Sequence, residues 1–121
     1  MTHRNVYGEK LKYCNRRKIT GYNRNGRCEV LDDDKGTHIV CCVMTNDFLK
    51  FTLSRGNDLI TPRGNFLGLI VGDTWCICAL RWVEAYKASP KYAPPIIGQS
   101  THENFLYYVP EKIVEMYLID N

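Results

Sequence analysis

Cysteine and histidine are the residues of this chain whose chemistry is easiest to name. The sequence holds six cysteines and three histidines among 121 residues, and a single isoleucine separates Cys76 from Cys78. Thiols act as nucleophiles, as metal ligands and as halves of disulfides. No stretch matches a phosphate-binding loop, a metalloprotease helix or a nucleophile elbow. The sequence therefore indicates a reactive site without naming a reaction, and it leaves open whether the protein is an enzyme.

The compartment of the protein decides whether its cysteines are thiols or disulfides. Residues 1–10 lack the apolar segment of a signal peptide, and no later apolar run approaches the roughly 20 residues that span a bilayer. We therefore expect a cytoplasmic protein with no membrane association, whose cysteines are thiols rather than disulfides. Cys41 and Cys42 are then predicted to be small buried apolar residues on opposite faces of one strand.

A zinc ion is the metal that the soft side chains of this sequence could bind. The available donors are Cys28, His38, Cys76, Cys78 and His102. On an extended strand, alternate residues lie about 6.6 Å apart, whereas two thiolates on one tetrahedral zinc lie under roughly 4 Å apart. The spacing of Cys76 and Cys78 therefore makes zinc the weaker hypothesis.

A thiol enzyme is the sharper alternative for the same residue types. One cysteine would be activated by His38 or His102, and Glu103 or Asp58 would orient the imidazole. Sequence separation neither supports nor excludes contact among these residues.

The polar stretch from Arg55 to Asp58 has a structural and a functional interpretation. In the structural one, Gly56 ends a helix while Asn57 and Asp58 make loop hydrogen bonds. In the functional one, Arg55 binds an anionic ligand and Asp58 fixes its geometry, with Trp75, Trp82 or His102 forming a wall of the pocket.

Positive charge is concentrated in the first quarter of the chain, although the formal net charge is only +3. Residues 1–28 hold eight basic side chains and one acidic side chain, Glu9. Tyrosines interleave with these charges, a combination that can stack bases while cations meet phosphates. A solvated basic face is the alternative explanation. The residues of this potential nucleic-acid surface are Lys10, Lys12, Tyr13, Arg16, Arg17, Tyr22 and Arg24.

Residue patterns predict an α+β fold: a small mixed or antiparallel sheet with about three helices around it. We expect one domain over residues 1–121, with a basic, loop-rich part at 1–37 and the α+β core at 38–121. The elements predicted in the core are strands at 38–44 and 74–78, helices at about 46–55 and from 79, a short third strand at 96–99, a helical turn with a capping box at Ser100–Glu103, and a last helix from Pro110.

Short motifs lie along nearly the whole chain, at Thr20–Tyr22, Asn25–Cys28, Gly36–His38, Val40–Cys41, Phe48–Phe51, Ser54–Leu59, Thr61–Pro62, Gly72–Ala79, Arg81–Trp82 and Thr101–Glu103. Together these segments resemble the domain-of-unknown-function 2237 family. That family consists of small single-domain proteins without an assigned activity, so the resemblance implies a fold and a set of recurring polar residues. This chain has Arg27 and a single Cys28 where the family pattern has paired cysteines.

Three functions of different classes follow from these observations. The sequence favours a site for an unknown small polar or anionic molecule over a nucleic-acid or anionic-partner interface. A structural or interaction domain with core cysteines is the third hypothesis. The residues predicted to bind the small molecule are Arg55, Asn57, Asp58, Trp75, Cys76, Cys78, His102 and Glu103.

Overall fold

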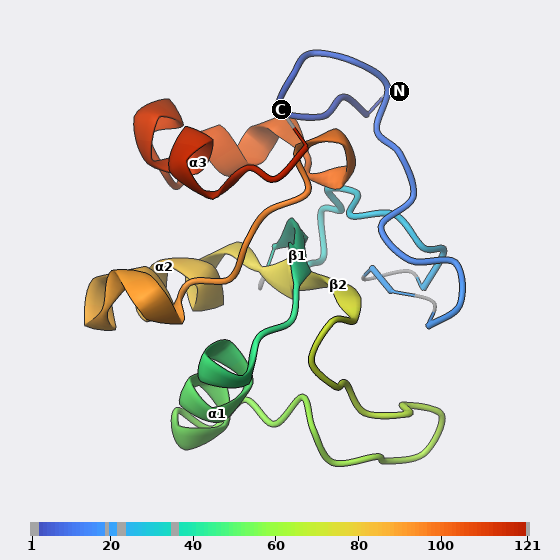
Figure 1. The fold of residues 1–121 in the computed structure, drawn as a ribbon. Coiled ribbons are helices and arrows are strands. Elements are labelled where there is room, and N and C mark those ends of the chain that lie inside the picture. The colour runs from blue at the N-terminus through green and yellow to red at the C-terminus, as the bar shows by residue number, and fades with distance from the viewer. Residues whose placement is uncertain (1–2, 19, 22–23, 35–36, 121) are drawn as a thin grey trace.

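A computed structural model of the chain describes residues 3–18, 20–21, 24–34 and 37–120. Within these residues it has a two-stranded antiparallel sheet, β1 (His38–Val43) and β2 (Thr74–Cys78). The α-helices of the described part are α1 (Asn46–Ser54), α2 (Ala79–Ala88) and α3 (Glu111–Tyr117). Figure 1 shows the helices on one side of the sheet and the N-terminal segment on the other. The α+β prediction is confirmed, and the sheet is antiparallel.

Strand β1 lies in the middle of the molecule because backbone groups pair with it on both edges. One edge pairs with β2, and the segment at residues 95–102 follows the other edge. Ile97 N donates to Cys41 O over 2.9 Å, and His102 N donates to Ile39 O over 3.0 Å. The predicted third strand at 96–99 is wrong: Ile96 makes isolated bridges, and a 3-10 turn at Gly98–Ser100 ends the extended stretch.

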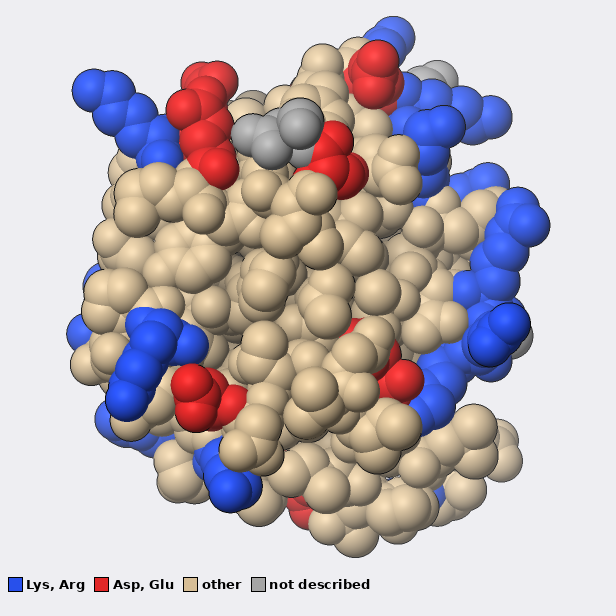
Figure 2. Space-filling model, viewed as in Figure 1, with Lys and Arg blue, Asp and Glu red and all other residues tan. Residues whose placement is uncertain are grey.

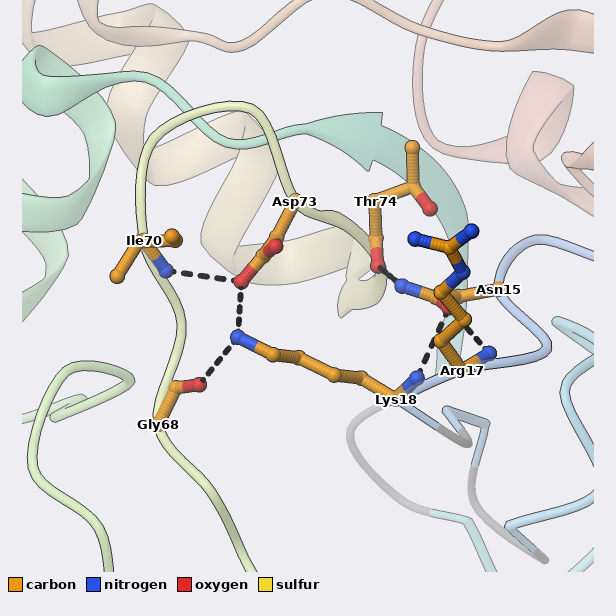
Figure 3. Close-up of polar contacts among 7 residues, drawn as sticks. All are labelled: Asn15, Arg17, Lys18, Gly68, Ile70, Asp73 and Thr74. Carbon is orange, nitrogen blue, oxygen red and sulfur yellow. Dashed lines mark hydrogen bonds and ion pairs between the residues drawn. The ribbon is translucent and has the colours of Figure 1, made fainter.

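The outer edge of β2 is covered by the irregular N-terminal segment. Thr20 Oγ1 accepts from Cys76 N over 2.8 Å, and Thr74 Oγ1 donates to Cys14 O over 2.7 Å. Asn15 Nδ2 donates to Thr74 O over 2.9 Å, as Figure 3 shows. These bonds satisfy buried polar groups that an uncovered strand would leave without partners.

The two faces of the sheet contact different clusters. Val40, Cys42 and Ile77 belong to the main apolar core, in which Trp82 and Phe48 are fully buried. Burial of one such large side chain stabilises the fold by roughly 1.5–3 kcal/mol. The opposite face carries a second cluster of buried cysteines, Cys14, Cys28, Cys41 and Cys76. The predicted separation of Cys41 and Cys42 onto opposite faces is therefore confirmed.

Local signals set the bounds of the first helix. Thr45 Oγ1 accepts from Phe48 N over 3.1 Å at the start of α1, and Gly56 adopts φ +87° just after its end. Left-handed φ values of this kind favour glycine after a helix.

The predicted capping box at Ser100–Glu103 is wrong, because Ser100 Oγ donates to Tyr13 O and His102 Nδ1 accepts from Asn104 N instead. None of the described helices has the length and apolar character needed to cross a membrane.

Candidate functional site

Four of the six cysteines form two disulfides, Cys14–Cys41 and Cys28–Cys76, with Cα–Cα distances of 5.6 and 5.3 Å. The prediction that all the cysteines are thiols is therefore wrong. The register of the sheet places Cys41 directly opposite Cys76, so the two disulfides lie side by side. The N-terminal segment then brings one partner to each of them. Cys42 and Cys78 are outside these disulfides.

Three cysteines of this disulfide cluster also form a potential metal-ligand group among the described residues. The sulfur atoms of Cys14, Cys28 and Cys41 lie within 4.8 Å of one another, and such a group could hold a metal ion once its disulfides are reduced, because thiolates are the ligands. The five donors that the sequence suggested for zinc are not brought together as one group. Cys28 and Cys76 are bonded to each other, whereas the two histidines have partners elsewhere, described below.

A cavity of about 480 Å³ lies where β2 runs into α2. Its wall includes three arginines that are far apart in sequence, Arg24, Arg63 and Arg81. We call it the arginine cavity. No aspartate or glutamate is among the described residues that line it. The other polar or reactive groups of its wall are His38, Asn57, Trp75, Cys76 and Cys78.

Arg63 is held in place by the loop that follows α1. Its guanidinium donates to Asp58 O over 2.7 Å and to Thr61 O over 3.1 Å, and Asp58 Oδ2 lies 3.6 Å from Nη1. Asp58 Oδ1 accepts from the backbone N–H groups of Ile60 and Thr61. The hydrogen bonds from Thr61, then that from Ile60, lower the pKa of Asp58. Asp58 therefore positions Arg63, whereas the sequence had suggested a role beside Arg55.

The other two arginines of the cavity come from segments that are far apart in the sequence. Arg81 lies in the first turn of α2, where its Nη1 donates to Glu84 Oε1 over 3.2 Å and to Arg55 O over 3.3 Å. Arg24 reaches the cavity from the N-terminal segment, with its guanidinium 5.3 Å from the Trp75 ring centroid. Arg55 contributes its carbonyl oxygen to this arrangement.

The guanidinium of Arg55 lies elsewhere, 5.0 Å from the ring centroid of Phe51 on α1. Arg55 is not among the described residues that line the cavity. Its side chain therefore packs on a helix, while Arg63 and Arg81 supply charge to the cavity wall.

His38, Asp34 and Cys78 form a second feature of the cavity. The buried Asp34 carboxylate, 2% exposed, accepts from His38 N and from His38 Nδ1, each over 2.8 Å. This contact places the ring proton on Nδ1, so Nε2 is the nitrogen that can exchange a proton. His38 is the strand partner of Cys78 beyond an irregularity in β1 between His38 and Val40, and both residues line the cavity. The sequence analysis did not identify Asp34 as the partner of His38, although the two residues are only four positions apart.

His102 and Glu103 lie against the N-terminal segment and are not among the described residues that line the arginine cavity. His102 is 6% exposed, and its Nε2 lies 3.1 Å from His3 Nδ1. Burial, and then the neighbouring His3, lower the pKa of His102. Glu103 N donates to Arg4 O over 2.9 Å. The structure thus divides the predicted ligand-binding residues between two places.

A second concave surface, of about 670 Å³, lies over the N-terminal segment. We call it the basic groove; Figure 2 shows blue side chains gathered along the right edge of the molecule, on the side where Figure 1 draws the N-terminal segment. Tyr13 lies under the guanidinium groups of Arg16 and Arg27, at 4.3 and 4.1 Å from the ring centroid. Tyr22 lies outside the described residues. The basic residues that line the groove are Lys10, Lys12, Arg16, Arg17 and Arg27.

Figure 3 shows how this basic segment is anchored. Asn15 Oδ1 accepts from the backbone N–H groups of Arg17 and Lys18, over 2.8 and 3.0 Å. The ammonium group of Lys18 pairs with the carboxylate of Asp73 and donates to Gly68 O. Asp73 therefore neutralises the charge of Lys18, and Lys18 is not among the basic residues that line the groove.

Comparison with known proteins places these sites in a family. No curated protein matches the chain. A family model described as "Uncharacterized protein conserved in bacteria (DUF2237)" matches residues 4–118. The match includes both strands, the cysteines of both disulfides and every residue named for the arginine cavity. The resemblance inferred from the sequence motifs is confirmed, and the chain belongs to the DUF2237 family of uncharacterized proteins conserved in bacteria.

Proposed function

We propose that this domain binds a small anionic molecule in the arginine cavity. The observation that carries the proposal is the convergence of Arg24, Arg63 and Arg81, from three separate segments, on one cavity whose described lining contains no carboxylate. Asp58 and Glu84, which pair with Arg63 and Arg81, lie outside the described lining. A bound anion would therefore supply the counter-charge that the cavity side of these guanidinium groups lacks.

The cavity wall also limits what the anion can be. A guanidinium has five N–H donors and matches carboxylate and phosphate oxygens in pairs. Asn57 and His38 add polar groups, while Trp75 and Phe66 add aromatic surface. The volume of about 480 Å³ is within the range of small-molecule sites. We therefore propose an organic carboxylate or phosphate with an apolar part.

The test is the thermal stability of the protein in phosphate and in citrate, with ionic strength held constant by chloride. A ligand that binds only the folded state raises the melting temperature by an amount that grows with the ratio of its concentration to its dissociation constant. We expect a rise for the native sequence that is mostly lost in Arg63→Met and Arg81→Met. Lys112→Met is the matched control, because it removes an exposed cation from α3. An equal rise in all four proteins would contradict the proposal.

The basic groove supports a second candidate function, contact with an anionic macromolecule such as a nucleic acid. Its described lining holds five basic side chains and no acidic one, and Arg27 Nε is buried without a hydrogen-bond partner among the described residues. Tyr13 is already covered by two guanidinium groups, so phosphate contacts rather than base stacking would supply the affinity. Retention on a single-stranded oligonucleotide column that weakens steeply with salt would support this function, and no retention at low salt would exclude it.

A further inference from the structure

We propose that Cys78 is a nucleophile of the arginine cavity, that His38 exchanges its proton, and that Asp34 positions His38. The proposal rests on the anion site above and gives that site a reaction: attack of the thiolate on a carbon of the bound anion. Cys78 and His38 are opposite each other across the two strands and line the same cavity. Asp34 holds His38 from its other side.

The position of Cys78 suits a reactive sulfur. Cys78 ends β2 and is the N-cap residue of α2, so the N-terminus of a ten-residue helix begins at its backbone. Arg81, one turn into that helix, lines the same cavity. Helix N-termini and nearby cations are surroundings that favour negative charge on a cysteine sulfur. The end of β2, the N-terminus of α2 and Arg81 therefore meet near the Cys78 thiol.

The arrangement of His38 suits a group that exchanges a proton. Asp34 is buried and accepts from both the backbone and the ring of His38, which fixes the ring orientation. The His38 side chain is 41% exposed and lines the arginine cavity. A nucleophile, a base and a group that orients the base are the parts of an activated-nucleophile site. His38 is thus the group that takes the proton, and Asp34 is a positioning residue.

The proposed step balances as a displacement at carbon. His38 Nε2 takes the proton of Cys78 Sγ, and the sulfur electron pair forms a bond to a ligand carbon that carries a leaving group. The bond from that carbon to the leaving group breaks, and the leaving group departs with its electron pair. The arginines hold the carboxylate or phosphate of the ligand during this step, and His38 can return the proton to the leaving group. No electrons are exchanged with a further reagent.

Cys42 is an internal comparison for Cys78. Both lie outside the disulfides, but Cys42 is fully buried in the main core, and burial raises the pKa of its thiol well above the usual range. Only the thiolate form attacks carbon. We therefore expect alkylation of the folded protein at Cys78 and not at Cys42.

The experiment compares two alkylating probes of similar size, iodoacetate, which is anionic, and iodoacetamide, which is neutral. In each case the sulfur displaces iodide, and peptide mass spectrometry reports which cysteine is modified. For Cys78, we expect the rate with iodoacetate divided by the rate with iodoacetamide to be larger than the same ratio measured for glutathione. We also expect phosphate to slow the reaction of Cys78 with iodoacetate. We also expect both reactions to be about 10-fold or more faster than those of an unfolded peptide with the same Cys78 sequence.

Variants assign the roles of the individual residues. Arg63→Met should slow the reaction with iodoacetate only, whereas Arg81→Met should slow both reactions, and the one with iodoacetate more, because Arg81 also favours the thiolate of Cys78. His38→Gln should slow both reactions by about 10-fold or more. Asp34→Asn should slow both without changing their ratio, whereas a distorted cavity would change the ratio. Cys42→Ala should change neither, and thermal unfolding checks that each variant is folded. If a variant does not fold, the alkylation rate of Cys78 in the native protein can still be compared with the rate in the unfolded peptide.

The results separate the failure of this proposal from the failure of the anion site. Stabilisation by anions with alkylation no faster than in the peptide would overturn Cys78 as a nucleophile and keep the anion site. Fast alkylation that depends on His38 but shows no preference for iodoacetate would overturn the anionic ligand and keep the nucleophile.

Discussion

Cys76 and Cys78 are two residues apart on one strand, yet they belong to chemically different regions. Cys76 is 1% exposed and is bonded to Cys28 within the disulfide cluster. Cys78 is half-buried, lies outside the disulfides and faces the arginine cavity together with His38. What differs is the residue that the fold brings to each of them: the N-terminal segment brings Cys28 to Cys76, and β1 places His38 opposite Cys78. The chemistry of a cysteine is therefore set here by contacts that are distant in sequence rather than by local sequence.

The two regions also differ in what they do for the fold. The disulfide cluster links a long irregular segment to the sheet through bonds that span 27 and 48 residues. In the chain-entropy account, closing loops of this length stabilises the folded state by about 3–4 kcal/mol each. In the arginine cavity, by contrast, Arg63 and Arg81 are held by partly exposed ion pairs with Asp58 and Glu84, and such pairs contribute about 0–1 kcal/mol each. One region therefore stabilises the fold strongly, and the other contributes little to its stability.

The largest effect should come from breaking the disulfide cluster. Replacing Cys28 and Cys76 together by alanine should lower the free energy of unfolding by about 2–5 kcal/mol, because the unfolded chain gains freedom. Urea unfolding monitored by tryptophan fluorescence measures this difference. Cys78→Ala is the matched control on the same strand and should cost far less. Equal losses in the two proteins would remove the proposed distinction between the regions.

A smaller effect should come from the hydrogen bond that seats the N-terminal segment on β2. Thr20 is fully buried, and its Oγ1 accepts from Cys76 N over 2.8 Å. Thr20→Val keeps the shape but leaves that N–H without its acceptor, so we expect a loss of about 1–3 kcal/mol in unfolding free energy. Thr20→Ser should retain most of the stability. Similar stability in the valine and serine variants would show that the bond contributes little.

Much of the secondary structure could be predicted because its signals are local. The strand at 74–78 has the predicted bounds, the end of the first strand shifts from 44 to 43, and Thr45 begins a helix as expected. The third strand and the capping box were wrong for one reason. Ser100 and its neighbours bond to β1 and to Tyr13, which are distant in sequence, and those partners override the local pattern.

The candidate site was predictable only in part. Asn57, Trp75, Cys76 and Cys78 do line one cavity, because two of its segments carry visible motifs. Arg63 and Arg24 were not foreseen as partners, since only the folded chain brings their loops together. The disulfides were missed because the compartment expected from the sequence favoured thiols, whereas the contacts that bring Cys14 to Cys41 and Cys28 to Cys76 form only in the folded chain.

A substitution that acts only on the arginine cavity should change its affinity for anions and leave the disulfide cluster unchanged. Asp58→Asn removes the charge that holds Arg63 while keeping an acceptor for the loop N–H groups. We expect the affinity for phosphate or citrate to fall about 3–10-fold, since a charge-assisted contact is lost. Titration calorimetry measures the affinity, and Asp47→Asn, an exposed change on α1, is the control. Unchanged affinity would mean that the loop backbone alone positions Arg63.

The smallest effect concerns His102, which lies outside both regions. Its Nδ1 accepts from Asn104 N, so the ring proton is on Nε2, and a second proton on Nδ1 would break that bond. Because the pKa of His102 is lowered in the fold, the unfolded chain binds this proton more readily. Stability should therefore be complete above the unfolded pKa of about 6.5 and should fall as pH drops from there through the lower, folded pKa. Urea unfolding between pH 7.5 and pH 5 measures the slope, which His102→Asn should reduce. A slope that the substitution leaves unchanged would assign the pH dependence to other groups, and anion affinity of the arginine cavity at pH 7.5 should be the same in both proteins.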